Sequence, residues 1–378
     1  MVYFEMKRSP SLTRSFPVLL LAALLASSPA TWAATWYWDT TAGSGNGVGG
    51  TGNMTSTSAT WSTTATGDNT LTTGSSTALA ANDLIFQGTA GTVTLSSGSV
   101  GMKSVTINTT GYTFNNTSTS ANRYLNSSNG ITLGNGVTVN FSSAQVATSG
   151  SGALGIMGTI TNAVGATGYG TVAITGDSGN AAGVGIRVGA RTTNSGAGAV
   201  DWWANVNVKT TGSSGAFLHV MDNSSTNRIR GDIVIDNGSK LTLSPGAATS
   251  RAIVVYGNIT TSAAGALAIG EANNTGFVEL RGNNTIIGDL NVYGQLGYRS
   301  TNALGSSRAV LNVGSTFGQS GSIGGDTQAE RTINNNILMN GGAWAAGTFV
   351  TLGGLGSANY LAGTIDLNGQ DRLIKLDN

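Results

Sequence analysis

Carboxylates and arginines gather in one stretch near the middle of this chain, and these are side chains suited to acid–base chemistry. Four aspartates fall within 36 positions, with one histidine and two arginines between them: Asp201, Asp222, Asp232, Asp236, His219, Arg228 and Arg230. Two facing carboxylates can hydrolyse a glycosidic bond, and an arginine beside acids can act as the base of a polysaccharide lyase. However, Asp232 follows Gly231 and Asp236 precedes Asn237-Gly238, which is typical of solvated turns. The turn interpretation is favoured, and no catalytic residue is predicted.

An aromatic pair, Trp202-Trp203, directly follows Asp201 and offers flat surfaces on which a sugar can stack. Adjacent side chains of a strand point to opposite faces, so only one of the two is exposed on a given side. The structural alternative places one indole in the core and the other over a loop. His219, between Leu218 and Val220, fits an ordinary strand position better than a catalytic base. Trp202 and Trp203 are therefore the only predicted binding residues.

The scarcity of reactive side chains excludes several kinds of site. With no cysteine and a single histidine, the chain has no thiolate metal ligands, and a Ser-His-Asp triad would have to use His219. Gly324-Gly325-Asp326 resembles part of a calcium-binding nonapeptide, but that motif requires tandem copies. Neither a metal nor a cofactor is predicted. Only 5 lysines and a net charge of +1 also argue against a nucleic-acid partner.

The elements that must position these residues are predicted to be short β-strands. Of 378 residues, 183 are glycine, threonine, serine or asparagine, and only 9% are charged, which excludes long salt-bridged helices. Apolar and polar residues alternate with a period of two in segments bounded by glycine or asparagine. Examples are Thr92–Leu95, Val137–Phe141, Lys240–Leu243, Ala266–Ile269, Phe277–Leu280, Val310–Val313 and Thr364–Leu367.

Turns this frequent predict an all-β fold in which each short strand stacks on the next. We expect a right-handed parallel β-helix, or β-solenoid, with coils of about 20 residues rising about 4.8 Å each. The alternative is an antiparallel β-sandwich. The β-solenoid is favoured because the inward positions are small or aliphatic and because only four prolines interrupt the chain.

The segment 1–33 reads as a secretory signal peptide. Lys7, Arg8 and Arg14 precede an apolar run over 16–26, which at about 11 residues is too short to span a bilayer. Cleavage is predicted between Ala33 and Ala34, and no integral membrane helix is predicted in the mature chain. The segment 34–88 carries Trp36, Trp38 and Trp61 and is expected to form an aromatic N-terminal cap. The segment 89–378 is expected to form the solenoid, which stops in strand-like sequence as if truncated.

One stretch, Gly276–Gly297, resembles the autotransporter-associated β-strand repeat of exported bacterial proteins. Ile286 replaces the aromatic residue usual in that repeat, so the copy is diverged. Segments 34–115 and 250–370 are similar to such proteins more broadly, through Trp36–Asp39, Ala59–Ser62, Asn82–Leu95, Ser300–Gly305 and Gly363–Gly369. Within Gly276–Gly297, the positions that match the repeat are Leu280, Gly282, Asn284, Thr285, Gly288, Val292, Gly294 and Leu296.

This resemblance implies a passenger region that is exported to the cell surface or medium, often joined to an outer-membrane barrel. We therefore expect an exported, non-enzymatic β-solenoid with a structural or adhesive role, located outside the cell or at the outer membrane. Surface polysaccharides or outer-membrane components are its expected partners. The alternatives are a β-helical polysaccharide-degrading enzyme and a carbohydrate-binding module.

Overall fold

The computed structural model describes residues 33–43, 45–143, 153–175, 184–189, 198–210, 215–220, 224–245, 251–270, 276–319, 331–341, 344–353 and 359–377. The chain divides into two units, residues 1–33 and residues 34–378, and the second holds all the elements below. Most of the predicted leader, together with Asp222 and residues 324–326, lies outside the described residues.

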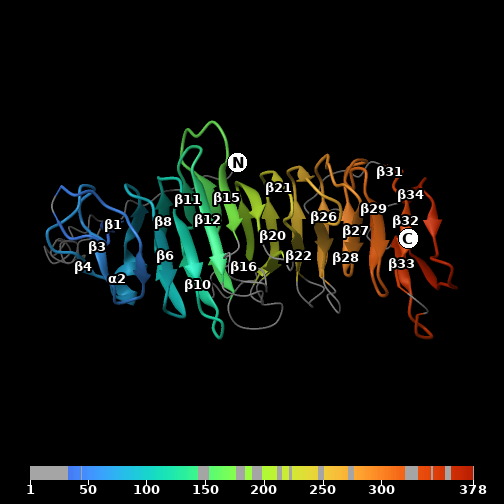
Figure 1. The fold of residues 1–378 in the computed structure, drawn as a ribbon, viewed down its shortest axis with the longest axis horizontal. Coiled ribbons are helices and arrows are strands. Elements are labelled where there is room, and N and C mark those ends of the chain that lie inside the picture. Colours follow the sequence, from blue (N-terminus) through green and yellow to red (C-terminus); the bar gives the residue numbers. More distant parts are fainter. Residues whose placement is uncertain are drawn as a thin grey trace, which may run out of the picture. The chain divides into compact units, whose positions relative to one another are not determined.

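Parallel strands in three long sheets build the second unit, and the coils follow one another in chain order (Figure 1). The fifteen-stranded sheet runs in the order β36 (Ile374–Asp377), β33 (Val350–Gly353), β30 (Thr316–Gln319), β28 (Gln295–Tyr298), β26 (Phe277–Leu280), β23 (Ala252–Val255), β20 (Ser224–Ile229), β17 (Gly198–Trp202), β14 (Ile160–Asn162), β11 (Ile131–Leu133), β8 (Ser104–Ile107), β5 (Asp83–Phe86), β1 (Thr35–Trp38), β3 (Ala59–Ser62), β4 (Thr72–Thr73).

The eleven-stranded sheet runs in the order β35 (Ile365–Asp366), β32 (Ile337–Met339), β29 (Arg308–Leu311), β27 (Asp289–Val292), β25 (Leu267–Ile269), β22 (Leu241–Ser244), β19 (Ala216–Val220), β16 (Val184–Gly189), β13 (Leu154–Met157), β10 (Arg123–Ser127), β7 (Ser99–Met102). The eight-stranded sheet runs in the order β2 (Gly52–Met54), β6 (Thr92–Leu95), β9 (Thr113–Asn116), β12 (Thr138–Ser143), β15 (Gly170–Thr175), β18 (Ala204–Lys209), β21 (Ile233–Ile235), β24 (Ile259–Thr261). A two-stranded sheet pairs β31 (Arg331–Ile333) with β34 (Asn359–Leu361).

The order in which the chain visits these sheets identifies the fold as a parallel β-helix. From β5 to β25, successive strands belong in turn to the fifteen-, eight- and eleven-stranded sheets. Among the described strand pairs, only β1 with β3 and β3 with β4 are antiparallel. The predicted β-solenoid is confirmed, and the antiparallel sandwich is wrong.

Coil length is less uniform than the sequence predicts. It is close to the expected value near the start, where Asp83 lies opposite Ser104, and again where Phe277 lies opposite Gln295, but the last coils are longer, with Thr316 opposite Thr351. In the middle of the chain the coils are longer, and Ile160 lies opposite Trp202, about twice as far along the chain. The extra residues there extend the connections between strands and leave the strand pairing parallel.

The core follows from the two-residue alternation. In β6, Val93 and Leu95 are buried while Thr92 and Thr94 are partly exposed, and β5 and β8 repeat this pattern. Aromatic rings fill the first coils: Phe86 stacks at 5.8 Å on Trp38 and meets Phe114 edge-on at 4.9 Å. Phe114 in turn contacts Phe141, so the aromatic core continues past residue 88. A short helix, α2 (Ser76–Ala81), buries Leu79 and is capped at its N-terminus by Ser75, whose side chain accepts the Ala78 N–H.

The corner between the fifteen- and eight-stranded sheets, hereafter the ladder corner, is built from stacked equivalent residues. Side-chain oxygens accept the backbone N–H of the next coil in a continuous series: Asn205 from Asp232 (3.0 Å), Asp232 from Asn258 (2.7 Å), and Asn258 from Asn283 (2.9 Å). The Ser300 hydroxyl then donates to Asn283 at 2.8 Å. These bonds satisfy turn groups that the sheets leave unpaired.

Glycines 231, 257 and 282 stack beside this series because the backbones come very close. A Cβ added at Gly257 would lie 2.1 Å from the Gly231 carbonyl oxygen, which is far inside contact distance. We expect Gly257→Ala to lower the free energy of unfolding by about 1–3 kcal/mol, the usual cost of overpacking. Gly101→Ala is the matched control in urea denaturation, because a Cβ there meets nothing within 4 Å. Equal stability of the two variants would contradict the prediction.

Candidate functional site

The Asp201 carboxylate is held by two arginines. Arg228 lies directly opposite Asp201 on the next strand, and its Nη1 is 3.4 Å from Oδ2. Arg230 approaches from the end of the same strand, with Nε and Nη2 each 2.8 Å from Oδ1. The three side chains are about one quarter exposed, at 23%, 28% and 24%. They form a polar cluster at the surface, the Asp201 cluster.

The other two described acids of this stretch lie apart from each other. Asp232 and Asp236 flank the short strand β21, so their Cα atoms are about 13 Å apart at the rise of an extended chain. Asp232 accepts a turn N–H, and Asp236 lies 3.9 Å from the Lys209 ammonium group. Both are therefore turn residues, as the glycines beside them indicate. Asp222 lies outside the described residues.

The two neighbouring tryptophans point to opposite sides of the strand. Trp202 is 1% exposed and belongs to the core, whereas Trp203 is 40% exposed. Of the two predicted binding residues, only Trp203 is therefore accessible to a ligand. Its place just after β17 puts it on the ladder corner, where its backbone N–H donates to Ile160.

A row of arginines and aromatic rings, the Arg–aromatic ladder, continues from Trp203 along this corner. Each member directly follows its strand: Trp203, Arg230, Tyr256 and Arg281 come after β17, β20, β23 and β26. The Arg230 guanidinium lies 5.0 Å from the Trp203 ring and 4.0 Å from the Tyr256 ring. Arg281 covers Tyr256 at 4.3 Å. Such cation–π contacts fix the guanidinium planes against the rings.

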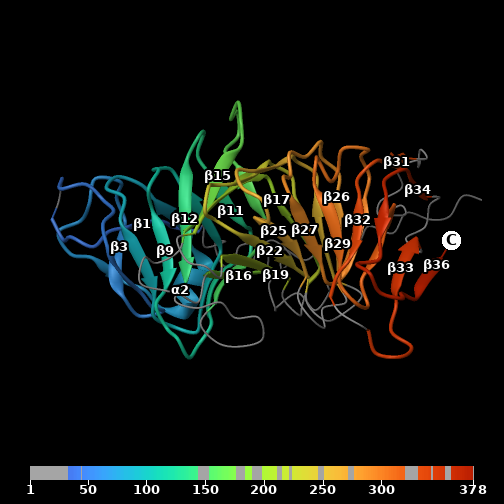
Figure 2. The ribbon, with the colours of Figure 1, turned by 45° about the vertical axis from the view of Figure 1, so that its right-hand side comes forward.

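A pocket opens beside the Trp203 end of this ladder. It has a volume of about 380 Å³ and is lined by Asn162, Ala166, Thr167, Gly168 and Tyr169. These residues lie in or next to the loop between β14 and β15, which projects above the neighbouring coils (Figure 2). The Tyr169 ring is 39% exposed and lies 6.4 Å from the Trp203 ring at an angle of 59°.

The side chain of Asn162 fixes this pocket relative to the ladder. Its amide donates to the Trp203 carbonyl at 2.6 Å, and its oxygen accepts the Gly170 N–H at 2.7 Å. Because one amide ties both ends of the loop to the neighbouring coil, Tyr169 and Trp203 are held as a pair of exposed rings. Such an arrangement can bind a flat ligand without first ordering its own side chains.

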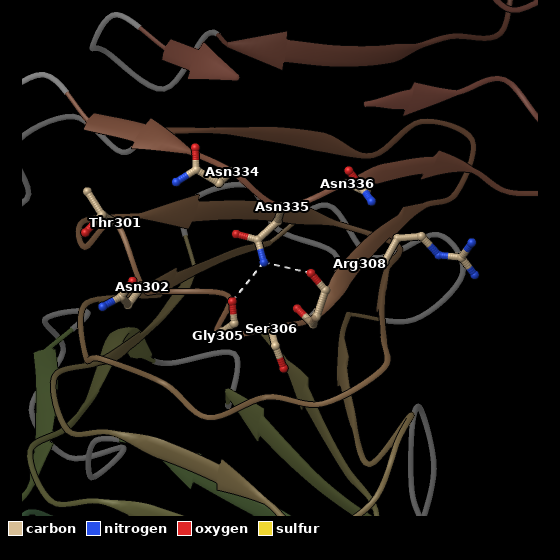
Figure 3. Close-up of a pocket in the computed structure, with 9 residues that line it drawn as sticks. Thr301, Asn302, Gly305, Ser306, Arg308, Asn334, Asn335 and Asn336 are labelled. Carbon is tan, nitrogen blue, oxygen red and sulfur yellow. Dashed lines mark hydrogen bonds between the residues drawn. The ribbon is translucent and has the colours of Figure 1, made fainter. Parts of the chain in front are cut away.

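A second, polar pocket of about 290 Å³ is lined mainly by the turns that precede β29 and β32 (Figure 3). At its centre the Asn335 amide donates to the carbonyls of Gly305 (2.9 Å) and Ser307 (2.7 Å). Arg308 turns away from it and binds Asp289 through two bonds of 2.9 and 2.8 Å, which lowers the pKa of Asp289. These polar groups mainly form hydrogen bonds between successive coils, so their donors and acceptors are already used within the protein.

His219 lies on β19 as an ordinary strand residue with a buried ring. It is 5% exposed, stacks on Phe217 with ring centroids 5.9 Å apart, and lies opposite Arg187 of β16. Burial, together with the Arg187 charge, lowers its pKa to about 4. The imidazole is therefore neutral at neutral pH, and it lies in a different sheet from the Asp201 cluster.

Within the described part of the chain, no group of three or more His, Cys, Asp or Glu residues is placed to hold a metal ion. No described helix has the length and apolar character needed to cross a membrane.

Tyr169, Tyr256 and Arg281 are not among the residues predicted from the sequence. A signal for two of them exists, because the triplets Arg230-Gly231-Asp232, Tyr256-Gly257-Asn258 and Arg281-Gly282-Asn283 recur at a nearly constant spacing. Read as a repeat, they predict that their first residues stack. Tyr169 belongs to a loop whose sequence is not repeated in the other coils, so no such repeat predicts its position.

No known protein-family model, no curated protein and no solved structure matches this chain.

Proposed function

We propose that the chain is an exported β-solenoid that acts at the cell surface or in the medium as a structural or adhesive passenger, without catalysis. The observation that carries this proposal is the parallel β-helix itself, which repeats its outer faces coil after coil. Solenoids commonly use such extended surfaces for binding. The leader-like segment at 1–33 and the similarity of 276–297 to the autotransporter-associated repeat add sequence support.

The carbohydrate-binding alternative is favoured by one observation, the exposed pair Tyr169 and Trp203 beside a pocket. The polysaccharide-degrading alternative has less support. It requires a pair of facing carboxylates, but Asp201 is bound by two arginines, and Asp232 and Asp236 stand at opposite ends of a strand.

Fractionation of cells that express the full chain tests the proposal. We expect the protein in the periplasm, at the surface or in the medium, with a mature N-terminus at Ala34 by N-terminal sequencing. A control variant lacking residues 2–33 should remain in the cytoplasm. Wild-type protein retained in the cytoplasm with residues 1–33 intact would refute export.

A further inference from the structure

The Trp203 end of the ladder corner combines three features that suit ligand binding. Two aromatic rings are exposed by about two fifths each, a pocket of about 380 Å³ opens beside them, and a cluster of charged side chains lies next to Trp203. The pocket volume falls within the range of about 300–1,000 Å³ that is common for small-ligand sites. Because all three come from three successive coils, those of β14, β17 and β20, their spacing is fixed by the sheets.

The rings themselves favour a ligand with flat, partly apolar faces. Tyr169 and Trp203 are inclined at 59° with ring centroids 6.4 Å apart, so the two rings contact each other and form one exposed aromatic surface. Around them lie the amide of Asn162 and the hydroxyl of Thr167, and the described surface there carries Val164 as a single exposed aliphatic side chain. Aromatic faces within a polar rim suit a sugar ring, which presents C–H groups on its faces and hydroxyls at its edges.

The Asp201 cluster supplies the polar contacts. A guanidinium carries five N–H donors, and the hydrogen bonds to Asp201 use one donor of Arg228 and one of Arg230, whose Nη2 also lies 2.8 Å from Oδ1. Both groups are about one quarter exposed, so donors remain on the solvent side. Guanidinium groups prefer carboxylates as partners and bind them with two parallel hydrogen bonds.

Arginines outnumber carboxylates at the ladder corner. Four arginines lie on or beside the ladder, Arg228, Arg230, Arg281 and Arg299, against three carboxylates, Asp201, Asp232 and Glu279. The excess at this corner is therefore one positive charge, in a chain whose net charge is +1. The ladder also repeats about every 4.8 Å along the coils, which suits an extended polymer better than an isolated small molecule.

We propose that this corner binds an acidic polysaccharide. A sugar ring stacks on the exposed aromatic surface formed by Tyr169 and Trp203, and a carboxylate of the same or the next sugar is bound by Arg228 and Arg230. The inference rests on the proposed adhesive function and names its ligand class. A single-stranded nucleic acid also stacks on aromatic rings, but its phosphates call for a denser row of basic side chains than this corner offers.

Binding of the purified protein to polygalacturonate, to neutral dextran and to poly(dT), measured by biolayer interferometry, tests the proposal. We expect polygalacturonate to bind best. Trp203→Ala and Tyr169→Ala should each weaken its binding by about tenfold or more, the loss of a stacked aromatic contact. Arg228→Ala should reduce the preference over dextran. Thermal melting of each variant verifies that it is folded.

Trp344→Ala is the matched control. Trp344 is also covered by an arginine, with the Arg372 guanidinium 4.3 Å from its ring, but it lies between β32 and β33, away from the ladder corner. This variant should bind polygalacturonate as the wild type does. The proposal is overturned if wild-type protein does not bind polygalacturonate, if Trp203→Ala binds it unchanged, or if poly(dT) binds more tightly. Export without polysaccharide binding would refute this inference alone, whereas cytoplasmic retention would refute the proposed function.

Discussion

Arg281→Met is expected to lower the free energy of unfolding by about 3–5 kcal/mol, the usual cost of leaving a buried charge without its partner. Glu279 is fully buried, and its Oε1 is bound by the Arg281 guanidinium. Its Oε2 is also buried and has no hydrogen-bond partner among the described residues. Methionine preserves most of the side-chain volume over Tyr256 but supplies neither charge nor donors, so the carboxylate loses its partner while remaining out of water.

The double variant Glu279→Gln/Arg281→Met should recover most of this loss, because the buried charge is then removed together with its partner. Urea denaturation gives the overall effect. Because a solenoid is stabilised largely through neighbouring coils, hydrogen exchange of residues 276–282 should show the local effect more sharply. If Arg281→Met costs less than about 1 kcal/mol, or if the double variant is no better, the buried pair does not stabilise the fold in this way.

The strands of this fold are predictable because each carries its own signal. In β6 and β22 the alternation of threonine with valine or leucine, closed by glycine, serine or asparagine, fixes which side chains enter the core. Nothing in such a segment specifies how far along the chain its partner lies. Parallel pairing depends on the length of the connection, and connections here vary from tight corners to long loops.

The candidate site was harder to predict for the same reason. A coil of the expected length would place Asp201 beside Asp222 and its neighbours, which suggests a pair of acids. The real coil is longer there, so Asp201 lies opposite Arg228 and forms an ion pair. The burial of one tryptophan and exposure of the other followed correctly from strand geometry, because that rule needs only the local backbone.

The ladder corner explains how these irregular coils keep their alignment. Three successive coils contribute one large side chain, one glycine and one side-chain acceptor in this order, as in Tyr256-Gly257-Asn258, and the Trp203 coil has Ala204 in place of the glycine. The acceptor bonds the next turn, the glycine allows the backbones to approach, and the large side chain stacks outside. Loops of different length can therefore be inserted elsewhere in a coil without shifting this corner, which keeps Trp203 and Arg230 in register.

Acidification is expected to destabilise the protein through His219 between pH 6.5 and pH 4. Its folded-state pKa is about 4, because burial and the Arg187 charge oppose protonation, whereas an unfolded chain protonates near 6.5. Over this window the unfolded state binds the extra proton, so stability is fully present above pH 6.5 and is lost as pH falls. The difference between the two pKa values corresponds to about 3 kcal/mol.

His219→Gln isolates this contribution, because glutamine stays neutral over the whole range while the carboxylates titrate alike in both proteins. The free energy of unfolding of the wild type, measured by urea denaturation from pH 7 to pH 4, should fall by about 3 kcal/mol more than that of the variant. The same decline in both proteins would mean that the imidazole takes up its proton in the folded state. That result would place His219 in contact with water or with a hydrogen-bond acceptor, in conflict with its 5% exposure and its position opposite Arg187.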